Sequence, residues 1–378
     1  MIKNVLITGG AGFIGSNLAL NLIKKNYSIT ILDNLSKQIH GTDPKSSFLY
    51  KSIKGKVKFI LGDVTNRNAW ETALEGQHAV IHLAAETGTG QSMYQIQKYC
   101  DVNINGTALL LDILANNKHS VQKIIVASSR AIYGEGKYYC NTHGNVYPLT
   151  RTEKDLLNHN FECKCPFCGS EVILRPTDEN SKIEPLSIYG ISKYTQEQLF
   201  LVAGTSLNIP AVAFRYQNVY GPGQSLSNPY TGILSIFSTQ IKNNNPINIF
   251  EDGKESRDFV YIDDVVNATI LGLENENANF NSYNVGSGIA TTVLEIANKL
   301  IALYKSQTSI KITGNFRMGD IRHNFADLTK IKKELNYIPK YLFDSGIEKF
   351  AKWVDNQQIS EDRYSTSIEE LKERGLYK

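Results

Sequence analysis

The chain has 378 residues, of which 42% are hydrophobic and 20% are charged, with 28 Gly and 10 Pro. This ordinary globular composition excludes disordered, collagen-like and low-complexity chains. The formal net charge is +3 at pH 7, and basic and acidic residues are interleaved, so the sequence predicts no nucleic-acid or membrane surface. A chain of this length can bury a large core and is expected to divide into two lobes.

Targeting and disulfide signals are weak. No apolar run reaches the ~18–20 residues that a membrane span needs. Residues 1–4 lead directly into an apolar stretch and a glycine turn, which indicates a first strand rather than a signal peptide. The five cysteines, three of them at positions 163–168, do not form a disulfide-scaffold pattern. The sequence therefore predicts a reduced, cytoplasmic protein.

Short apolar segments alternate with helical patterns in the first 130 residues. Each segment is rich in β-branched or aliphatic residues and is followed by small or polar ones, which is typical of parallel strands covered on both faces. The predicted strands span 5–8, 28–32, 58–61, 79–83 and 123–127, and helical spacing covers 17–25 and 107–117. This alternation predicts a doubly wound α/β sheet.

The alternation breaks at 134–186, a segment that contains four of the five cysteines. Regular patterning then resumes, with helices expected over 189–202 and 233–242, a strand over 212–215, and a strand over 259–262 followed by a helix over 263–273. We expect 1–133 to form a first domain, 134–186 to be an insert, and 187–220 to return to the first domain. Residues 221–378 would mainly form a smaller α/β lobe and a helical tail.

A glycine-rich turn, TGGAGFIG at 8–15, follows the first strand and opens the first helix. Glycine permits the tight turn and lets the backbone approach a pyrophosphate, and the helix N-terminus offers N–H groups to the phosphates. The alternative is a glycine-rich connector without a ligand. Strand, turn and helix together predict a Rossmann-type dinucleotide site that includes Gly9, Gly12, Phe13, Ile14 and Gly15.

An acidic residue, Asp33, ends the second strand and is followed by Asn34. A carboxylate at this place can accept hydrogen bonds from an adenosine ribose and would repel a 2′-phosphate, which favours NAD over NADP. The alternative is that Asp33 only caps its loop. Residues expected farther along the same cofactor are Asp63 and Val64 beside the adenine, and Leu83, Ala84 and Ala85 at a turn of small residues.

Tyr189 and Lys193 are four residues apart at the start of a predicted helix, so they share one helical face. A free tyrosine, with a pKa of ~10, is a poor base at neutral pH. A nearby ammonium and an oxidised nicotinamide would lower that pKa, so that Tyr189 could remove a hydroxyl proton while hydride leaves the same carbon. Ser129, after the fifth strand, could hydrogen-bond the same oxygen. Alone, a Tyr–Lys pair of this spacing is also common on protein surfaces.

Motifs spread from residue 1 to about 355, apart from the insert, resemble the extended short-chain dehydrogenase/reductase superfamily, in particular its nucleotide-sugar epimerases and dehydratases. The matching segments are 8–15, 33–34, 82–85, 105–107, 128–134, 189–193, 215–223, 257–264, 283–286 and 319–322. The resemblance implies that Ser129, Tyr189 and Lys193 are the catalytic set, that NAD is tightly held, and that the C-terminal lobe binds a nucleoside diphosphate sugar. It also implies a homodimer through a helix pair that includes 189–202.

The resemblance also assigns substrate contacts by motif position. It implies that Asn218 lies near the substrate diphosphate and that Arg257 and Arg322 contact its phosphates. Arginine suits this work because its forked donors form charge-assisted hydrogen bonds. The alternative for both arginines is a surface salt bridge. Tyr230, in the segment 228–232, is expected to face the substrate.

The residues before Tyr133 reduce the number of reactions that the resemblance allows. In related 4,6-dehydratases an Asp-Glu pair stands where this chain has Arg130 and Ala131, and related decarboxylases and 3,5-epimerases place Glu or Cys at the second position. Those reactions need a second acid or base beside the sugar ring, and alanine cannot serve. The resemblance thus implies oxidation of C4, rotation of the 4-keto sugar and return of the hydride, which is 4-epimerisation.

Further motifs resemble one subgroup, the bacterial dTDP-L-rhamnose 4-epimerases, which interconvert that sugar with dTDP-6-deoxy-L-talose. The motifs are 82–86, 91–94, 129–135 and a Cys-Pro-x-Cys-Gly insert. A 2-epimerase or a 4-keto-sugar reductase using NAD or NADP remains an alternative, and so does a non-catalytic NAD sensor with a partner-binding zinc ribbon. Glu86, Gln91 and Arg130 are expected near the sugar without assigned roles.

The insert contains two similar ligand pairs, Cys140 with His143 and Cys165 with Cys168, each separated by two residues and followed by glycine. Two such pairs supply four N/S ligands for a closed, tetrahedral structural zinc site. Cys163 could substitute for one ligand, and free buried thiols are the alternative. Catalytic zinc is disfavoured because four protein ligands leave no open position. The insert has no dense basic run for nucleic acid.

Overall fold

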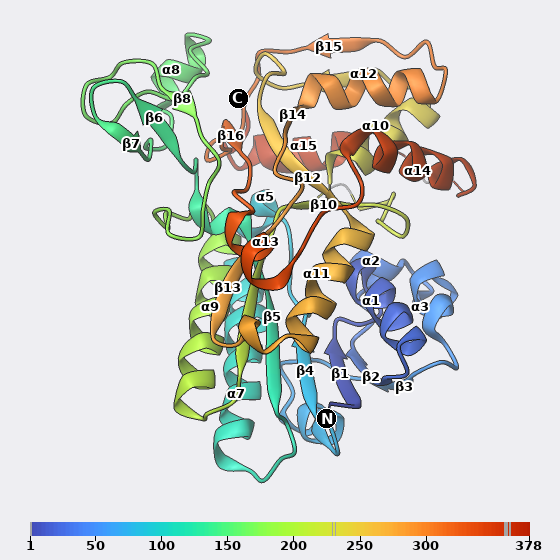
Figure 1. Ribbon diagram of the computed structural model, residues 1–378. Coiled ribbons are helices and arrows are strands. Elements are labelled where there is room, and N and C mark those ends of the chain that lie inside the picture. The colour runs from blue at the N-terminus through green and yellow to red at the C-terminus, as the bar shows by residue number, and fades with distance from the viewer. Residues whose placement is uncertain (1, 229, 231, 359–361, 363) are drawn as a thin grey trace.

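A seven-stranded parallel sheet forms the centre of the computed structural model, which describes residues 2–228, 230, 232–358, 362 and 364–378 (Figure 1). The strand order is β13-β9-β5-β4-β1-β2-β3. In chain order the strands are β1 (Asn4–Thr8), β2 (Ser28–Asp33), β3 (Lys58–Leu61), β4 (Ala79–His82), β5 (Lys123–Ser129), β9 (Ala211–Tyr216) and β13 (Asn281–Val285). The predicted doubly wound α/β fold is confirmed.

Both faces of this sheet are covered by helices, which explains its unbroken apolar strands. In β1, Val5 and Ile7 pack on the face covered by α1 (Phe13–Lys24) and α11 (Ile262–Glu274). Leu6 faces the opposite layer. That layer is formed by α4 (Arg67–Leu74), α7 (Gly106–Asn116) and α9 (Ile188–Ser206). Successive strand side chains thus alternate between two separate cores.

The C-terminal part of the chain builds a smaller lobe above the carboxyl ends of the central strands (Figure 1). Its strands are β10 (Asn218–Tyr220), β12 (Ser256–Tyr261), β14 (Ala290–Thr292) and β16 (His323–Asn324), with a separate parallel pair, β11 (Ile247–Ile249) and β15 (Ile310–Ile312). Its helices are α10 (Ile233–Lys242), α12 (Val293–Leu303), α14 (Phe343–Asp355) and α15 (Tyr364–Glu373). Two elements from beyond residue 221, β13 and α11, join the central sheet layer instead.

Residues 134–186 leave the sheet and stand to one side of the smaller lobe (Figure 1). They form an antiparallel sheet of β6 (Tyr138–Cys140), β7 (Gly144–Val146) and β8 (Ile173–Leu174). The short helix α8 (Glu153–Leu157) lies between β7 and β8 in the chain. Their own apolar cluster is small, with Tyr138, Val146 and three cysteines buried in it. An apolar core of this size gives little stability by itself.

Shorter elements connect these layers. They are α2 (Lys37–His40), α3 (Phe48–Ile53), α5 (Thr89–Ser92), α6 (Ile96–Tyr99), a π-helical turn (Cys100–Asn105), a 3₁₀ turn (Arg130–Tyr133) and α13 (Thr329–Leu335). Across the residues that the structure describes, no helix combines the length and the apolar character needed to cross a membrane.

Candidate active site

The glycine turn between β1 and α1 has no space for side chains at two positions. Gly9 has a φ of +64°, and a Cβ there would lie 2.8 Å from the backbone nitrogen of Ala84. A Cβ on Gly15 would lie 2.4 Å from the carbonyl oxygen of Gly9. The N-cap of α1 is Gly12, which has no side chain that could accept hydrogen bonds from the start of the helix. The first N–H groups of α1 therefore remain available to an anion.

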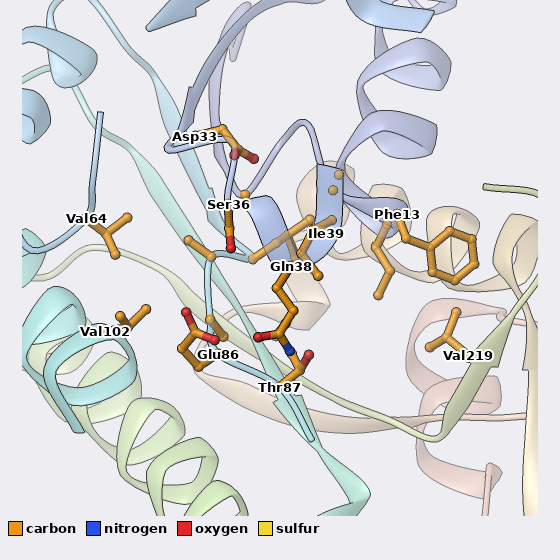
Figure 2. Close-up of a pocket in the computed structure, with 18 of the residues that line it drawn as sticks. Phe13, Asp33, Ser36, Gln38, Ile39, Val64, Glu86, Thr87, Val102 and Val219 are labelled. Atoms are coloured by element: carbon orange, nitrogen blue, oxygen red, sulfur yellow. The ribbon is translucent and has the colours of Figure 1, made fainter. Parts of the chain in front are cut away.

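A cavity of about 340 Å³ opens beside this turn, within the size range of small-molecule sites (Figure 2). In Figure 2 Val64 and Val102 lie on one side of it, and Phe13 and Val219 lie on the other. The predicted cofactor residues that line it are Gly9, Gly12, Phe13, Ile14, Gly15, Asp33, Asn34, Val64, Leu83, Ala84, Ala85, Tyr189 and Lys193. The sequence pattern gave no signal for further lining residues that follow β2, namely Ser36 and, in α2, Gln38, Ile39 and His40.

Asp33 lies at the end of this cavity with its carboxylate almost fully buried. One oxygen accepts a hydrogen bond from the N–H of Ala11 at 3.0 Å, and the other accepts one from the N–H of Leu35 at 2.8 Å. Burial raises the pKa of this carboxyl, while the two backbone donors and His40 oppose the rise. Asp33 thus joins the glycine turn to the loop after β2.

Asp63 is the one predicted cofactor residue that is not among the residues lining the cavity. Its carboxylate accepts a hydrogen bond from the Asn34 amide at 2.8 Å and two from Thr65. These donors lower its pKa against the opposing effect of burial. Asp63 therefore lies outside the cavity lining and holds the loop of Asn34, which is part of that lining.

A second cavity, of about 450 Å³, lies between the central sheet and the smaller lobe. It shares several lining residues with the first cavity, so the two spaces meet: Thr87, Ser129, Tyr189, Gln217, Val219 and Gln224. Ser129 is at the carboxyl end of β5, and Tyr189 is in the first turn of α9, whose N-cap Ser187 accepts a hydrogen bond from Gly190 at 3.0 Å. Two of the three predicted catalytic residues thus lie at the junction.

The pKa of Tyr189 differs from the sequence prediction. We expected a lowered pKa, but burial of the phenol is the largest effect, and it raises the pKa. A hydrogen bond with Ser129 and the positive charge of Arg130 oppose that rise. The sequence prediction counted the ammonium and an oxidised nicotinamide, and it left out the cost of desolvating a buried phenolate.

Lys193 is also buried, and this burial lowers the pKa of its ammonium to about 7, against the opposing charge of Glu197. Its Nζ donates a hydrogen bond to the Gln196 side chain at 2.6 Å. Gln196 in turn donates to Thr107 at 2.7 Å. The Thr107 hydroxyl also contacts Nε2 of the fully buried His82 at 3.0 Å. A chain of polar contacts therefore connects the lysine with the strand β4.

A buried ion pair fixes the helix that carries Tyr189 and Lys193. The guanidinium of Arg215, on β9, contacts both carboxylate oxygens of Glu197, with a closest distance of 2.6 Å. The same guanidinium donates to the hydroxyl of Tyr133 at 2.7 Å. Helix, strand and the turn after Ser129 are therefore held together by one charged group.

Three arginines line the second cavity: Arg130, Arg257 and Arg317. Arg130 donates a hydrogen bond to the Asn218 amide oxygen at 3.2 Å, and Arg317 pairs with Asp320 at 2.8 Å. Of the predicted substrate residues, Asn218, Tyr230 and Arg257 line this cavity. Pro229 and Thr231, in the predicted loop at 228–232, lie outside the described residues.

Arg322 does not line either cavity, although the resemblance placed it at the substrate phosphates. Its side chain is fully buried, and carboxylates of Glu162, Glu251 and Asp252 surround the guanidinium at 2.5–3.0 Å. A buried guanidinium requires counter-charges, and these carboxylates supply them to Arg322. The arginine that does face the cavity, Arg317, precedes the matched segment 319–322, and no sequence signal distinguished the two.

Other residues that line the two cavities, or lie beside them, differ in their chemistry. Ala131 lines it, at the position where related enzymes place an additional acid or base. The carboxylates in its lining, Glu251, Glu255 and Asp320, accompany the arginines, and burial raises the pKa of Glu255 to about 7. Glu86 lines the first cavity. Gln91 is buried behind it and exchanges hydrogen bonds with Gln38.

The insert brings Cys140, His143, Cys165 and Cys168 together, with their ligand atoms all within 4.8 Å of one another. The Sγ of Cys140 is 3.8 Å from that of Cys168, and Nδ1 of His143 is 3.6 Å and 3.5 Å from the sulfurs of Cys140 and Cys165. Ligands bound about 2.3 Å from a tetrahedral zinc ion would be about 3.8 Å apart. The four side chains therefore fit a zinc ion. Cys163 is outside this cluster, buried beside Tyr138 and Glu135.

Comparison with known proteins agrees with this geometry. The profile of the NAD dependent epimerase/dehydratase family matches residues 5–286. A dTDP-L-rhamnose 4-epimerase from Burkholderia thailandensis is 35% identical over 354 residues, which cover 93% of this chain and 95% of that protein. A UDP-glucuronate 4-epimerase from Thermodesulfobacterium geofontis is 29% identical, covering 92% of this chain and 95% of that protein.

Solved structures show the same similarity. UDP-glucose 4-epimerase from Thermotoga maritima, with UDP-glucose, superposes with a TM-score of 0.74 at 27% identity, covering 93% of this chain and 99% of that one. UDP-glucuronic acid 4-epimerase from Bacillus cereus, with UDP-glucuronic acid and NAD, gives a TM-score of 0.76 at 26% identity and the same coverage. Sequence and fold agree along the whole Rossmann-type domain. The chain belongs to the NAD dependent epimerase/dehydratase family.

Proposed function

We propose that this protein is an NAD-dependent nucleotide-sugar 4-epimerase. The observation that carries the proposal is the position of Ser129 and Tyr189 where two cavities meet. One cavity has the glycine turn and an acidic residue at the end of β2, and the other has three arginines. A dinucleotide in the first and a diphosphate sugar in the second would bring their reacting ends to the same two hydroxyl groups.

Two features of the first cavity suit NAD: the bare backbone of the glycine turn and the negative charge of Asp33. Glycines 9 and 15 leave the backbone bare where side chains would collide, and the N-terminus of α1 faces the space with unpaired N–H groups. Asp33 would accept hydrogen bonds from the adenosine ribose and repel a 2′-phosphate. NAD in this place would supply reversible hydride transfer at a sugar carbon.

The residues of the chain supply the proton transfer. Tyr189 takes the proton of the sugar 4-hydroxyl at its phenol oxygen, and Ser129 hydrogen-bonds the same sugar oxygen. The charge of Arg130 favours the phenolate, and Lys193, on the same face of α9, would add a second positive charge when protonated. After the 4-keto sugar has turned, Tyr189 returns the proton, so each turnover leaves the side chains unchanged. Because Ala131 has no acid or base to expel water, the pathway ends at the epimer.

For the substrate we propose dTDP-L-rhamnose, with dTDP-6-deoxy-L-talose as product. The 35% identity with the Burkholderia thailandensis enzyme over nearly the whole chain supports this choice. In the second cavity Arg257 and Arg317 would bind the diphosphate, and Arg317 takes the place that the sequence analysis assigned to Arg322. A homodimer through α9, which exposes Ile191 and Val202, and a cytoplasmic location both stay predictions.

The test is direct. Purified protein is incubated without added cofactor with a panel of dTDP-, UDP-, GDP- and CDP-sugars, and products are identified by NMR. We expect conversion of one sugar to its C4 epimer. A C2 epimer would favour the 2-epimerase, and a steady absorbance change at the reduced-nicotinamide band would favour a reductase. Failure on every sugar, together with nucleic-acid or protein capture that survives moderate salt, would favour the non-catalytic sensor.

We also propose that the insert holds one structural zinc ion through Cys140, His143, Cys165 and Cys168. Two ligand pairs, whose four ligand atoms all lie within 4.8 Å of one another, support it. With four protein ligands the ion has no position for substrate, so its role is to fold the insert.

Replacing Asp33 by alanine is expected to weaken NAD binding by roughly ten- to a hundredfold, because one charged acceptor is lost. The amount of NAD released from the denatured protein, per chain, measures it. Asp63→Asn is the comparison variant: Asp63 lies outside the cavity lining and acts on it only through Asn34, so its NAD content should fall less. Equal NAD in Asp33→Ala and the parent would show that the carboxylate does not bind the ribose.

Replacing Arg130 by glutamine is expected to move the pH dependence of kcat to higher pH. The charge of Arg130 lowers the pKa of Tyr189, so its removal raises that pKa, and the phenolate then forms only at higher pH. Arg317→Gln is the control in the same cavity; it should raise KM and leave the pH profile in place. An unchanged profile in Arg130→Gln would assign the stabilising charge to another group.

A further inference from the structure

The last residues of the chain, 364–378, supply part of the lining of the second cavity. Three residues of α15, namely Tyr364, Ile368 and Leu371, belong to the lining of that cavity. Their spacing of four and three places them on one face of the helix. Leu371 is buried, and one of its methyl groups would lie 3.7 Å from a Cβ on Gly90, in the α5 segment that also lines the cavity. The tail is thus a wall of the substrate space.

A cluster of polar side chains holds α15 against the rest of this wall. The Glu370 carboxylate accepts hydrogen bonds from the hydroxyls of Tyr230 and of Tyr94, the latter at 2.9 Å. The two hydroxyls are 3.1 Å apart. The guanidinium of Arg374 lies 4.3 Å from the centre of the Tyr94 ring. Tyr230 itself lines the cavity, so the tail and the loop before α10 form a continuous surface.

The final residues pair with the segment that carries the cavity arginine. The N–H of Phe316 donates to the carbonyl of Lys378 at 2.8 Å, and the N–H of Lys378 donates back to Phe316 at 3.0 Å. Met318 donates to the carbonyl of Leu376 at 3.2 Å. Arg317 lies between these paired residues and faces the cavity. These hydrogen bonds therefore fix the backbone on both sides of Arg317 to the last residues of the chain.

We propose that residues 364–378 are part of the substrate-binding site, where α15 walls the space for a nucleoside diphosphate sugar and the chain end holds Arg317 toward its diphosphate. The proposal rests on the proposed function for the identity of the ligand. The contacts are distributed over α5, the loop of Tyr230 and the 315–318 segment, so the tail closes a site whose other walls come from distant parts of the sequence.

Binding of dTDP and of UDP, measured by calorimetry, tests the proposal without requiring turnover. A chain that ends at residue 358 is expected to bind these nucleotides more weakly by roughly ten- to a hundredfold, the effect of losing one charge-assisted contact. Its NAD content per chain should equal that of the parent, because no residue of the tail lines the first cavity. Parent-like nucleotide affinity in the truncated chain would overturn the proposal.

Point variants give a second test that does not depend on the stability of the truncated chain. Glu370→Ala and the pair Ile368→Ala with Leu371→Ala should raise KM for the sugar substrate more than they change kcat. Glu369→Ala, on the exposed side of the same helix, is the matched control and should leave both constants unchanged. If the Glu370 variant behaves as the Glu369 variant does, and the apolar pair leaves KM unchanged, the tail has no binding role.

The two proposals fail in different ways. Weaker dTDP or UDP binding in the variants, in a protein that epimerises no sugar, would support the binding role of the tail and overturn the 4-epimerase. Epimerisation with an unchanged KM in the truncated chain would support the 4-epimerase and overturn the binding role of the tail. A full-length chain that binds none of dTDP, UDP, GDP and CDP would overturn both proposals.

Discussion

Tyr189→Phe is expected to lower kcat by roughly 10²- to 10⁴-fold, the contribution of a positioned acid–base group. The substitution removes a single oxygen at the junction of the two cavities, where the proton of the sugar hydroxyl has to go. Ring packing should survive, because phenylalanine keeps the ring that packs edge-to-face with Tyr99, with centroids 6.5 Å apart. We therefore expect KM and the bound NAD to change little.

A tyrosine on the same helix supplies the control. Tyr194→Phe removes the same atom from a residue that lines neither cavity, and it should keep the kcat of the parent. Initial rates of epimer formation by NMR, with the NAD content of each variant, make the comparison. A Tyr189→Phe protein that keeps full turnover would mean that another group moves the proton, and the mechanism would have to be reassigned.

The double variant Cys165→Ser with Cys168→Ser is expected to reduce zinc from one ion per chain to none. The effect on the insert should be large, because structural zinc contributes about 10–16 kcal/mol in small zinc-binding domains. The apolar cluster of the insert is small, and two of its buried members, Cys140 and Cys165, are themselves proposed ligands. Without the ion, residues 138–174 should exchange backbone hydrogens rapidly, while the central sheet stays protected and keeps NAD.

Metal analysis and hydrogen exchange measure these outcomes. Cys163→Ser is the matched control: this thiol lies between two of the ligands in sequence but outside the ligand cluster, beside Tyr138 and Glu135. It should retain one zinc ion per chain. Stoichiometric zinc in the Cys165 and Cys168 double variant would place the ligands elsewhere in the chain.

Burial explains why the chemistry of the active site was harder to predict than its location. Tyr189, Lys193 and Ser129 were found from a motif, and the structure places all three at the cofactor cavity. The rise that burial causes in the pKa of Tyr189 could not be predicted, because desolvation depends on how many side chains close over the phenol. A sequence shows neighbours along the chain and gives no measure of that closure.

The two arginines near Gly319 show a second limit. They are five residues apart, and motif position assigned the phosphate contact to Arg322. Arg322 lies outside the cavity lining, and its buried guanidinium is neutralised by Glu162, Glu251 and Asp252, which are 160, 71 and 70 residues distant. Arg317 faces the cavity because the end of the chain pairs with its neighbours.

The sequence by itself determined the features that depend on local spacing. These are the parallel strands, recognised because both of their faces are apolar, the glycine turn that opens α1, and the two ligand pairs of the insert. Only the tertiary structure decided which charges pair, how deeply the phenol is buried and what α15 covers. The physical reason is that local spacing follows from backbone geometry, whereas burial and ion pairing depend on segments that meet only after the chain has folded.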